Sequence, residues 1–175
     1  MKIFIIGYMG AGKSSMGKAI APIFNFKHID LDIYIEKNLD TTIQKIFNSK
    51  GEEYFRKVEH NSLKKIIENE DNFILSVGGG TSVFFDNMEM MKKSGITVYL
   101  KLNPKVLLSR LLNSRKKRPL IEKLSKEELL DYIIKNLEKR EHYYNQANLI
   151  IDSLNLNKKY LAEKIYQYIE QNDFC

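Results

Sequence analysis

The chain of 175 residues contains one cysteine, Cys175, and no long apolar run. A single cysteine excludes a disulfide framework within the chain, argues against a metal cluster and fits a reducing compartment. No window approaches the roughly 18 apolar residues of a membrane span. Residues 1–6 lead straight into a glycine loop, without the apolar region of a signal peptide. We therefore expect a cytoplasmic protein with no membrane partner.

Internal repeats, low-complexity segments and linkers are also missing from the sequence, which is 43% hydrophobic and 29% charged, as in ordinary globular domains. The formal net charge of +6 is compatible with nucleic acid, a membrane surface or a small anionic substrate. Lysines are interleaved with glutamates along the whole chain, which favours solvated helix faces over a binding patch. We expect a single domain over residues 1–175, no nucleic-acid partner and a monomer.

Short apolar runs alternate with longer segments of helical periodicity. The apolar runs predict strands at 2–6, 27–30, 72–77, 96–100 and 149–152. The periodic segments predict helices at 12–24, 41–47, 55–68, 86–93, 104–112, 125–146 and 158–171. Strand–helix alternation is typical of βα units around a parallel sheet. The basic stretch 114–123, SRKKRPLIEK, has no clear periodicity and predicts a mobile loop.

Residues 7–14, GYMGAGKS, match the phosphate-binding pattern G-x-x-x-x-G-K-[ST] in full. The glycines allow successive backbone N–H groups to face inward, and the following helix directs its positive dipole end at the same point. We expect Lys13 to reach the β- and γ-phosphates of a nucleoside triphosphate, and the Ser14 hydroxyl to ligate Mg²⁺. The motif follows a predicted buried strand and opens a predicted helix, as its function requires.

GTPases, motor ATPases and small-molecule kinases all use such a loop. The sequence has no Asn-Lys-x-Asp guanine motif, and apart from the short run 28–30 no apolar strand after the loop's helix ends in aspartate. The chain is too short for a motor core with a partner-binding domain. A small kinase is therefore the leading class, and a non-catalytic, nucleic-acid-binding protein is the alternative from another class.

Asp30 and Asp32 follow the second predicted strand, at the edge where open α/β sheets bind ligands. One acid can support Mg²⁺ while the other accepts hydrogen bonds from substrate hydroxyls; alternatively, Asp32 caps the next helix. Three consecutive glycines follow the third predicted strand at the same edge. They either expose backbone N–H groups to a ligand or form a plain turn: Gly78, Gly79 and Gly80.

Arg56 and Arg140 can each clamp a carboxylate bidentately, although either one taken singly is more typical of a surface arginine. Glu59 lies three residues after Arg56 on the same helix face and can orient it. Arg118 in the basic stretch can act as an arginine finger on the transferring phosphate; a solvated loop or an RNA-binding patch is the alternative. Three histidines share no spacing and are interpreted as structural: His28, His60 and His142.

The ordered set of motifs resembles the shikimate kinase family. In this sequence the motifs are, in order, the phosphate loop, Asp30-x-Asp32, Gly51-Glu-x-x-Phe55-Arg56, Gly78-Gly79-Gly80, Arg118-Pro119-Leu120 and Arg140. The resemblance covers the chain from Ile3 to about Asp152. It implies a three-layer α/β P-loop kinase fold with a five-stranded parallel sheet of order 2-3-1-4-5 and helices on both faces. It also implies a substrate-binding segment at about 31–60 and a mobile lid at about 113–124.

The resemblance further implies ATP-dependent phosphorylation of the shikimate 3-hydroxyl, in the chorismate route to aromatic amino acids. ATP phosphates would contact Gly10, Ala11, Gly12, Lys13, Ser14 and Ser15, with Arg110 on the adenine and Arg118 reaching in from the lid. Mg²⁺ would be supported by Ser14 and Asp30. Asp32 would take the substrate hydroxyls, and the carboxylate would meet Arg56, Arg140 and the glycines at 78–80. The catalytic residues implied are Lys13, Asp32 and Arg118.

The sequence departs from the family pattern in places. Ser15 stands where the family usually has threonine, and Glu141-His142-Tyr143-Tyr144 replaces the usual x-Pro-Leu-Tyr. A gluconate or nucleotide kinase of the same fold is an alternative. A nucleotide kinase needs a base pocket and more phosphate-directed arginines, whereas a polyol carboxylate needs an acid for its hydroxyls and arginines for its carboxylate. Three residues favour the polyol carboxylate: Asp32, Arg56 and Arg140.

Overall fold

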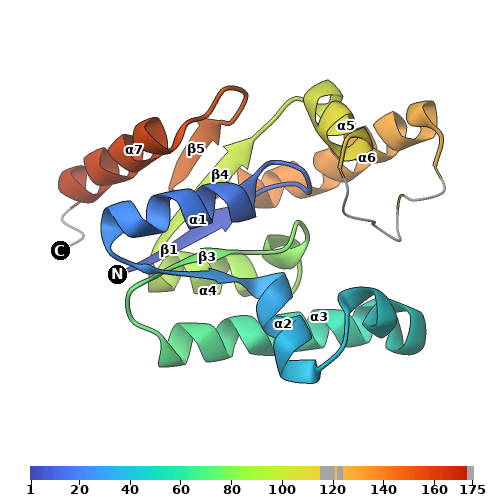
Figure 1. The fold of residues 1–175 in the computed structure, drawn as a ribbon, viewed down its shortest axis with the longest axis horizontal. Coiled ribbons are helices and arrows are strands. Elements are labelled where there is room, and N and C mark those ends of the chain that lie inside the picture. The colour runs from blue at the N-terminus through green and yellow to red at the C-terminus, as the bar shows by residue number, and fades with distance from the viewer. Residues whose placement is uncertain (115–120, 122–123, 173–175) are drawn as a thin grey trace.

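The computed structural model describes residues 1–114, 121 and 124–172. Its centre is one parallel sheet of order β2-β3-β1-β4-β5 (Figure 1). The strands are β1 (Lys2–Ile6), β2 (Lys27–Asp30), β3 (Phe73–Ser76), β4 (Ile96–Lys101) and β5 (Leu149–Asp152). The predicted strand order is confirmed. The three inner strands are almost wholly buried, which explains why their sequences are continuous apolar runs rather than alternating ones.

Helices cover both faces of the sheet. They are α1 (Lys13–Phe24), α2 (Leu31–Leu39), α3 (Ile43–Asn69), α4 (Asn87–Ser94), α5 (Pro104–Leu112), α6 (Lys126–Tyr144) and α7 (Lys158–Gln171), with a 3-10 turn η1 (Thr81–Val83). Helices α1 and α7 contact each other over one face, and α3 and α4 contact each other over the opposite face (Figure 1). Helices α5 and α6 pack together towards the carboxyl ends of the strands. No helix in the described ranges is both long and apolar enough to cross a bilayer.

Helix α2 is the element that the sequence did not predict. Only Leu31 and Ile35 are buried along it, so its apolar periodicity is weak. It begins directly after β2, and its N-cap is Asp30, whose side chain accepts a hydrogen bond from the backbone N–H of Ile33. The alternative that Asp32 caps this helix is therefore wrong. The N-cap needs extended backbone, which the last residue of the strand supplies and Asp32, in the first turn, does not.

Helix α3 spans the two helices predicted at 41–47 and 55–68, with a break between them. The helix is interrupted at Gly51, whose backbone angles are φ 79° and ψ 175°. A positive φ of this kind favours glycine, so the break is encoded at this residue. The part of α3 that carries Arg56 therefore begins after Gly51, and its helix axis does not continue that of the preceding turns.

Helix α6 begins with the predicted capping box. The Ser125 side chain accepts from the backbone N–H of Glu128, and the Glu128 carboxylate accepts from the backbone N–H of Ser125. The helix then continues without interruption to Tyr144. His142 stands where the family usually has proline. The helix is nevertheless regular through the turn that carries Arg140.

Candidate active site

The phosphate loop connects β1 to α1. Gly10 and Gly12 have φ values of 85° and 95°, which an L side chain rarely adopts, and Gly12 is the N-cap residue of α1. The backbone N–H of Ala11 donates to the carbonyl of Tyr8 at 3.1 Å and tightens the turn. The first N–H groups of a helix have no partner within it, and the positive dipole end of α1 lies at this loop, so the site suits an anion.

Lys13 is folded back over this loop. Its Nζ donates to the carbonyls of Gly7 and Tyr8 at 2.8 and 3.0 Å, and the residue is 8% exposed. An ammonium group held at the loop by neutral carbonyls keeps a positive charge beside the helix N-terminus. This arrangement suits a polyphosphate, which attracts both.

A hydroxyl and a carboxylate meet beside the loop. Ser14 Oγ donates to Asp30 Oδ2 at 2.5 Å, while Asp30 Oδ1 accepts from the backbone of α2. Hard oxygen donors of this kind suit Mg²⁺, which keeps several waters and typically takes one or two carboxylates plus substrate phosphates. The described residues contain no group of three or more His, Cys, Asp or Glu side chains that could hold a metal by themselves.

One cavity of about 380 Å³ joins the phosphate loop, the two acids and the glycine run. It lies where β1, β2 and β3 end, the edge at which open α/β sheets bind ligands. Of the residues predicted to form the site, the following line it: Gly10, Gly12, Lys13, Ser14, Ser15, Asp30, Asp32, Gly78, Gly79 and Arg110. Ala11, Gly80, Arg56 and Arg140 are not among the lining residues, and Arg118 lies outside the described residues.

Arg110 reaches from α5 across to the phosphate loop. Its Nη1 donates to the carbonyls of Gly10 and Ala11 at 3.4 and 3.3 Å, and its Nη2 donates to the carbonyl of Ser153 at 3.2 Å. Arg110 thus bridges the phosphate loop and the segment that follows β5. Its predicted contact with adenine stays a prediction.

Because the glycines at 78–80 have no side chain, other parts of the site approach their backbone closely. A Cβ on Gly80 would lie 2.7 Å from Arg56 Nη2, and one on Gly78 would lie 2.7 Å from Glu59 Oε1 and 3.4 Å from Asp32 Oδ1. A Cβ on Gly79 would lie 3.1 Å from the backbone nitrogen of Met9. The run therefore brings three parts of the site together: the acids, the arginine and the phosphate loop.

Arg56 is buried and not a surface arginine, which corrects the alternative stated for it. Its Nη1 donates to Glu59 Oε2 at 2.8 Å, and its guanidinium lies 4.3 Å from the centre of the Phe84 ring. Glu59 is 1% exposed and also accepts a hydrogen bond from the Thr81 hydroxyl at 2.6 Å. Burial raises the pKa of Glu59, an effect that the guanidinium of Arg56 opposes. The predicted contact between Glu59 and Arg56 is confirmed.

Arg140 approaches the same region from α6. Its Nη1 donates to the carbonyl of Gly79 and its Nη2 to Asn136 Oδ1, both at 3.2 Å. The Tyr144 hydroxyl donates to the same Gly79 carbonyl, and the Tyr8 ring lies 5.4 Å from the guanidinium. These partners are neutral, so they orient Arg140 without neutralising its charge.

The histidines contact structural partners. His28 Nε2 lies 3.1 Å from Ser76 Oγ, and His60 Nδ1 lies 2.7 Å from Asn87 Oδ1. Burial lowers the pKa of His28, which favours its neutral form. Both contacts agree with the structural interpretation of these residues.

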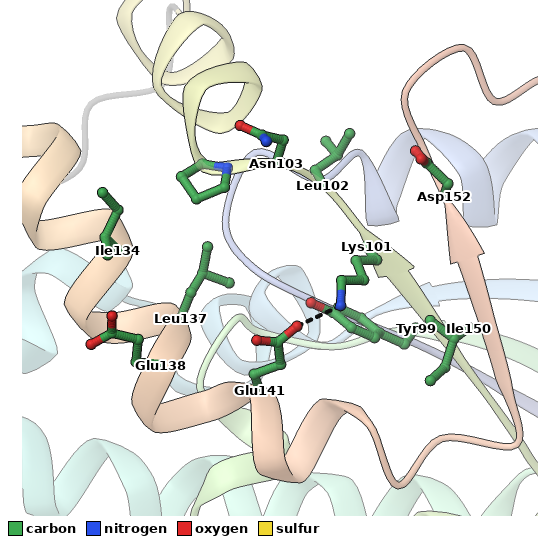
Figure 2. Close-up of a pocket in the computed structure, with 11 residues that line it drawn as sticks. Tyr99, Lys101, Leu102, Asn103, Ile134, Leu137, Glu138, Glu141, Ile150 and Asp152 are labelled. Atoms are coloured by element: carbon green, nitrogen blue, oxygen red, sulfur yellow. Dashed lines mark hydrogen bonds and ion pairs between the residues drawn. The ribbon is translucent and has the colours of Figure 1, made fainter.

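A second, larger cavity of about 600 Å³ lies between the ends of β4 and β5, the start of α5 and the side of α6 (Figure 2). Tyr99, Ile150 and Leu137 are among its lining residues, and the ion pair between Lys101 and Glu141, at 2.6 Å, lies across it. None of the residues predicted to form the site line this cavity. Its size alone therefore does not make it the active site.

Sequence reasoning missed several contacts of Arg56 and Arg140. Glu52 accepts from Arg56 Nε and Nη2; its spacing of four residues on a helix was a usable signal. Phe84 and Tyr8 lie over the two guanidinium groups. They come from other elements, and no local pattern pairs them with an arginine.

A family model described as "Shikimate kinase" matches residues 9–170. The shikimate kinase of Bacteroides thetaiotaomicron is 41% identical over 171 residues, which are 98% of this chain and 97% of that protein. The shikimate kinase of Bacteroides fragilis is 47% identical over 150 residues, covering 86% of this chain and 83% of that protein. The sequence similarity thus spans nearly the whole length of both proteins.

Solved structures give the same result. The crystal structure of the Bacteroides thetaiotaomicron shikimate kinase matches with a TM-score of 0.90 and 39% identity, over 97% of this chain and 98% of that one. The Acinetobacter baumannii shikimate kinase in complex with shikimate matches with a TM-score of 0.85 and 32% identity, over 98% and 93%. A gluconokinase from Sinorhizobium meliloti, at a TM-score of 0.57 and 16% identity over 97% and 91%, shares the fold alone. The chain belongs to the shikimate kinase family.

Proposed function

We propose that the chain transfers the γ-phosphoryl group of ATP to the 3-hydroxyl of shikimate, giving ADP and shikimate 3-phosphate. Its family makes the chain a shikimate kinase, an enzyme of the shikimate pathway that uses ATP, and this excludes the non-catalytic alternative. The observation that carries the residue assignment is the 380 Å³ cavity, which the phosphate loop, Asp32 and the glycine run line together. A phosphate-binding surface and a hydroxyl acceptor thus line the same cavity.

The donor phosphates bind at the loop between β1 and α1. Backbone N–H groups from Gly10 to Ser15 and the positive end of α1 take the phosphate oxygens. Lys13 Nζ exchanges its contacts with the Gly7 and Tyr8 carbonyls for the β- and γ-phosphates. The ammonium exchanges neutral carbonyl acceptors for anionic phosphate oxygens, and the added attraction between opposite charges favours the exchange.

Ser14 Oγ and the Asp30 carboxylate would hold Mg²⁺ on the phosphates. The two groups already face each other at 2.5 Å, and both line the cavity. The ion would neutralise charge on the transferring phosphoryl group. Asp30 keeps its other oxygen on the backbone of α2, which fixes the orientation of the carboxylate.

Asp32, Arg56 and Arg140 hold the acceptor. Asp32 lines the cavity and accepts a hydrogen bond from the hydroxyl that attacks. Arg140 and Arg56 bind the carboxylate, an assignment supported by their converging on Gly79 and Gly80. A new bond forms between the acceptor oxygen and the γ-phosphorus, the bond to the ADP oxygen breaks, and the hydroxyl proton passes towards Asp32 or water. Because this transition state is loose, positioning and charge supply most of the catalysis.

The segment at 31–60 and the lid at 113–124 are proposed to close the site. Helix α2 and the following turns of α3 supply Asp32, Arg56 and Glu59 from one projecting unit of the fold (Figure 1). Arg118 is proposed to meet the phosphates from the lid, and its position lies outside the described residues. The whole set comes from one chain, so we propose that the enzyme acts as a monomer.

Replacing Gly80 with alanine tests the acceptor half of the site. The new Cβ would lie 2.7 Å from Nη2 and 2.8 Å from Nη1 of Arg56. The guanidinium would have to move although Phe84 and Glu59 confine it. We expect the KM for shikimate to rise about tenfold or more, because small misplacements of a positioning group are costly. The KM for ATP, measured in the same assay, should stay unchanged; an equal rise in both would contradict the assignment.

The acceptor is tested by measuring ADP release with shikimate, gluconate and nucleoside monophosphates in one coupled assay. We expect rapid turnover with shikimate and little with the others. Nucleoside monophosphates have no carboxylate for the two arginines. Gluconate has a carboxylate and hydroxyls, but on a flexible chain whose ordering in the site costs free energy that the ring of shikimate avoids. Faster turnover with gluconate or a nucleotide would overturn the proposal in favour of another kinase of this fold.

A further inference from the structure

The guanidinium of Arg56 is enclosed by groups of its own chain. Nη1 donates to Glu59 Oε2 at 2.8 Å, while Nε and Nη2 both donate to Glu52 Oε1, at 3.1 and 2.9 Å. The Phe84 ring covers one face at 4.3 Å. Arg56 is only 7% exposed. An arginine enclosed in this way has to give up a contact before it can bind a substrate carboxylate through its side edge.

The two acids on Arg56 differ in how firmly they are held. The side chain of Glu59 is 1% exposed and has a second hydrogen bond from Thr81. Removing Glu59 from Arg56 would leave a buried, unpaired charge, which is strongly unfavourable. The side chain of Glu52 is 51% exposed, against 1% for Glu59, so the Glu52 carboxylate can rotate into water and regain its hydration, which the Glu59 carboxylate cannot do. Glu52 is therefore the partner that an incoming anion can replace.

The edge of Arg56 that Glu52 occupies is one that can bind a carboxylate. The Nε–H and Nη2–H groups of arginine point in parallel and form the fork that binds a carboxylate. Glu52 accepts from both of them. Its carboxylate thus stands in for the acceptor carboxylate, with the same chemistry on the same two donors. Arg140, held by a carbonyl and an amide, keeps its charge available to attract the anion first.

We propose that Glu52 is an internal competitor for the acceptor carboxylate: it occupies Arg56 in the free enzyme and is displaced when a carboxylate held by Arg140 takes its place. This rests on the proposed function, in which Arg56 and Arg140 bind that carboxylate. Glu52 then determines specificity as well as affinity. An acceptor without a carboxylate cannot displace Glu52, so Arg56 stays paired with Glu52.

The test compares Glu52→Gln with Glu53→Gln. Glu53 is the next residue on the same helix and makes the same kind of i,i+4 ion pair, at 2.7 Å, with the exposed Lys57. Both variants remove one negative charge, but only the first weakens the competitor at Arg56. We expect Glu52→Gln to lower the KM and the calorimetric Kd for shikimate roughly two- to fivefold, as loss of a partly exposed ion pair allows. The improvement should appear in KM and not in kcat. Glu53→Gln should leave the KM and Kd for shikimate unchanged.

Two further measurements connect the gain to the carboxylate and to Arg56. Binding of the acceptor's carboxamide analogue, which has no charge, should not improve in Glu52→Gln. In an Arg56→Lys background, where the fork is missing, Glu52→Gln should give no gain for shikimate either. A gain that persists in either experiment overturns the proposal.

The opposite result is equally clear. If Glu52→Gln raises the KM for shikimate, Glu52 orients Arg56 and does not compete, and the proposal is wrong. An improvement of the same size in Glu53→Gln would show a general charge effect and would also overturn it. Failure of the proposed function looks different, because the wild-type enzyme would then not turn over shikimate at all.

Discussion

Replacing Lys13 with alanine is expected to lower kcat for shikimate phosphorylation by about a thousandfold or more. Loss of one preorganised group that stabilises developing charge costs about 10²–10³ in rate, and Lys13 acts on the group being transferred. Its Nζ already lies at the carbonyls of Gly7 and Tyr8, beside the N-terminus of α1. The coupled ADP assay measures the loss directly.

Lys18→Ala is the matched control for this experiment. Lys18 lies on the same helix but is exposed, so its removal changes the net charge equally without touching the loop. We expect Lys18→Ala to retain near wild-type turnover. A Lys13→Ala enzyme that keeps more than about a tenth of the wild-type kcat would be inconsistent with the role given to Lys13.

The second large effect is expected for Asp32→Asn. The amide keeps the size of the carboxylate but loses its charge and its basicity. It cannot take the proton of the acceptor hydroxyl, and it orients that hydroxyl only through a weaker, uncharged hydrogen bond. We expect kcat to fall by about 10²–10⁴, the usual contribution of a general acid or base. The KM for ATP should change little, because the phosphates are held by the loop.

Asp40→Asn provides the comparison for this change. Asp40 is exposed at the C-terminal end of α2, with φ 46°, a backbone conformation that asparagine tolerates well. Its replacement removes the same charge from the same helix, and we expect no loss of activity. Equal losses in the two variants, or an Asp32→Asn enzyme as fast as wild type, would exclude a direct role for Asp32 in the transfer.

The sheet and the phosphate loop could be predicted because their signals are local. Each strand is a short apolar run, and the loop's glycines, lysine and serine are consecutive. Helix α2 was missed because its short amphipathic pattern has only Leu31 and Ile35 as buried positions. The break between the helices predicted at 41–47 and 55–68 lies at Gly51, whose positive φ favours glycine.

The environment of the arginines could not be predicted for a different reason. Arg56 is buried because Phe84 and Gly80, more than twenty residues along the chain, meet it in space. The sequence marked Gly80 as part of a turn or a ligand contact, but a Cβ at this position would meet the guanidinium of Arg56. Contacts between separate elements follow from the packing of the whole domain, and no spacing rule covers them.

The most direct test of the central claim is the identity of the product. The purified enzyme, incubated with ATP, Mg²⁺ and shikimate, can be followed by phosphorus and proton NMR. The account predicts one phosphate monoester, on the 3-hydroxyl, formed in a one-to-one ratio with ADP. Release of ADP without a phosphorylated acceptor, or a phosphate on another hydroxyl, would contradict the arrangement in which Asp32 presents that hydroxyl to the phosphate loop.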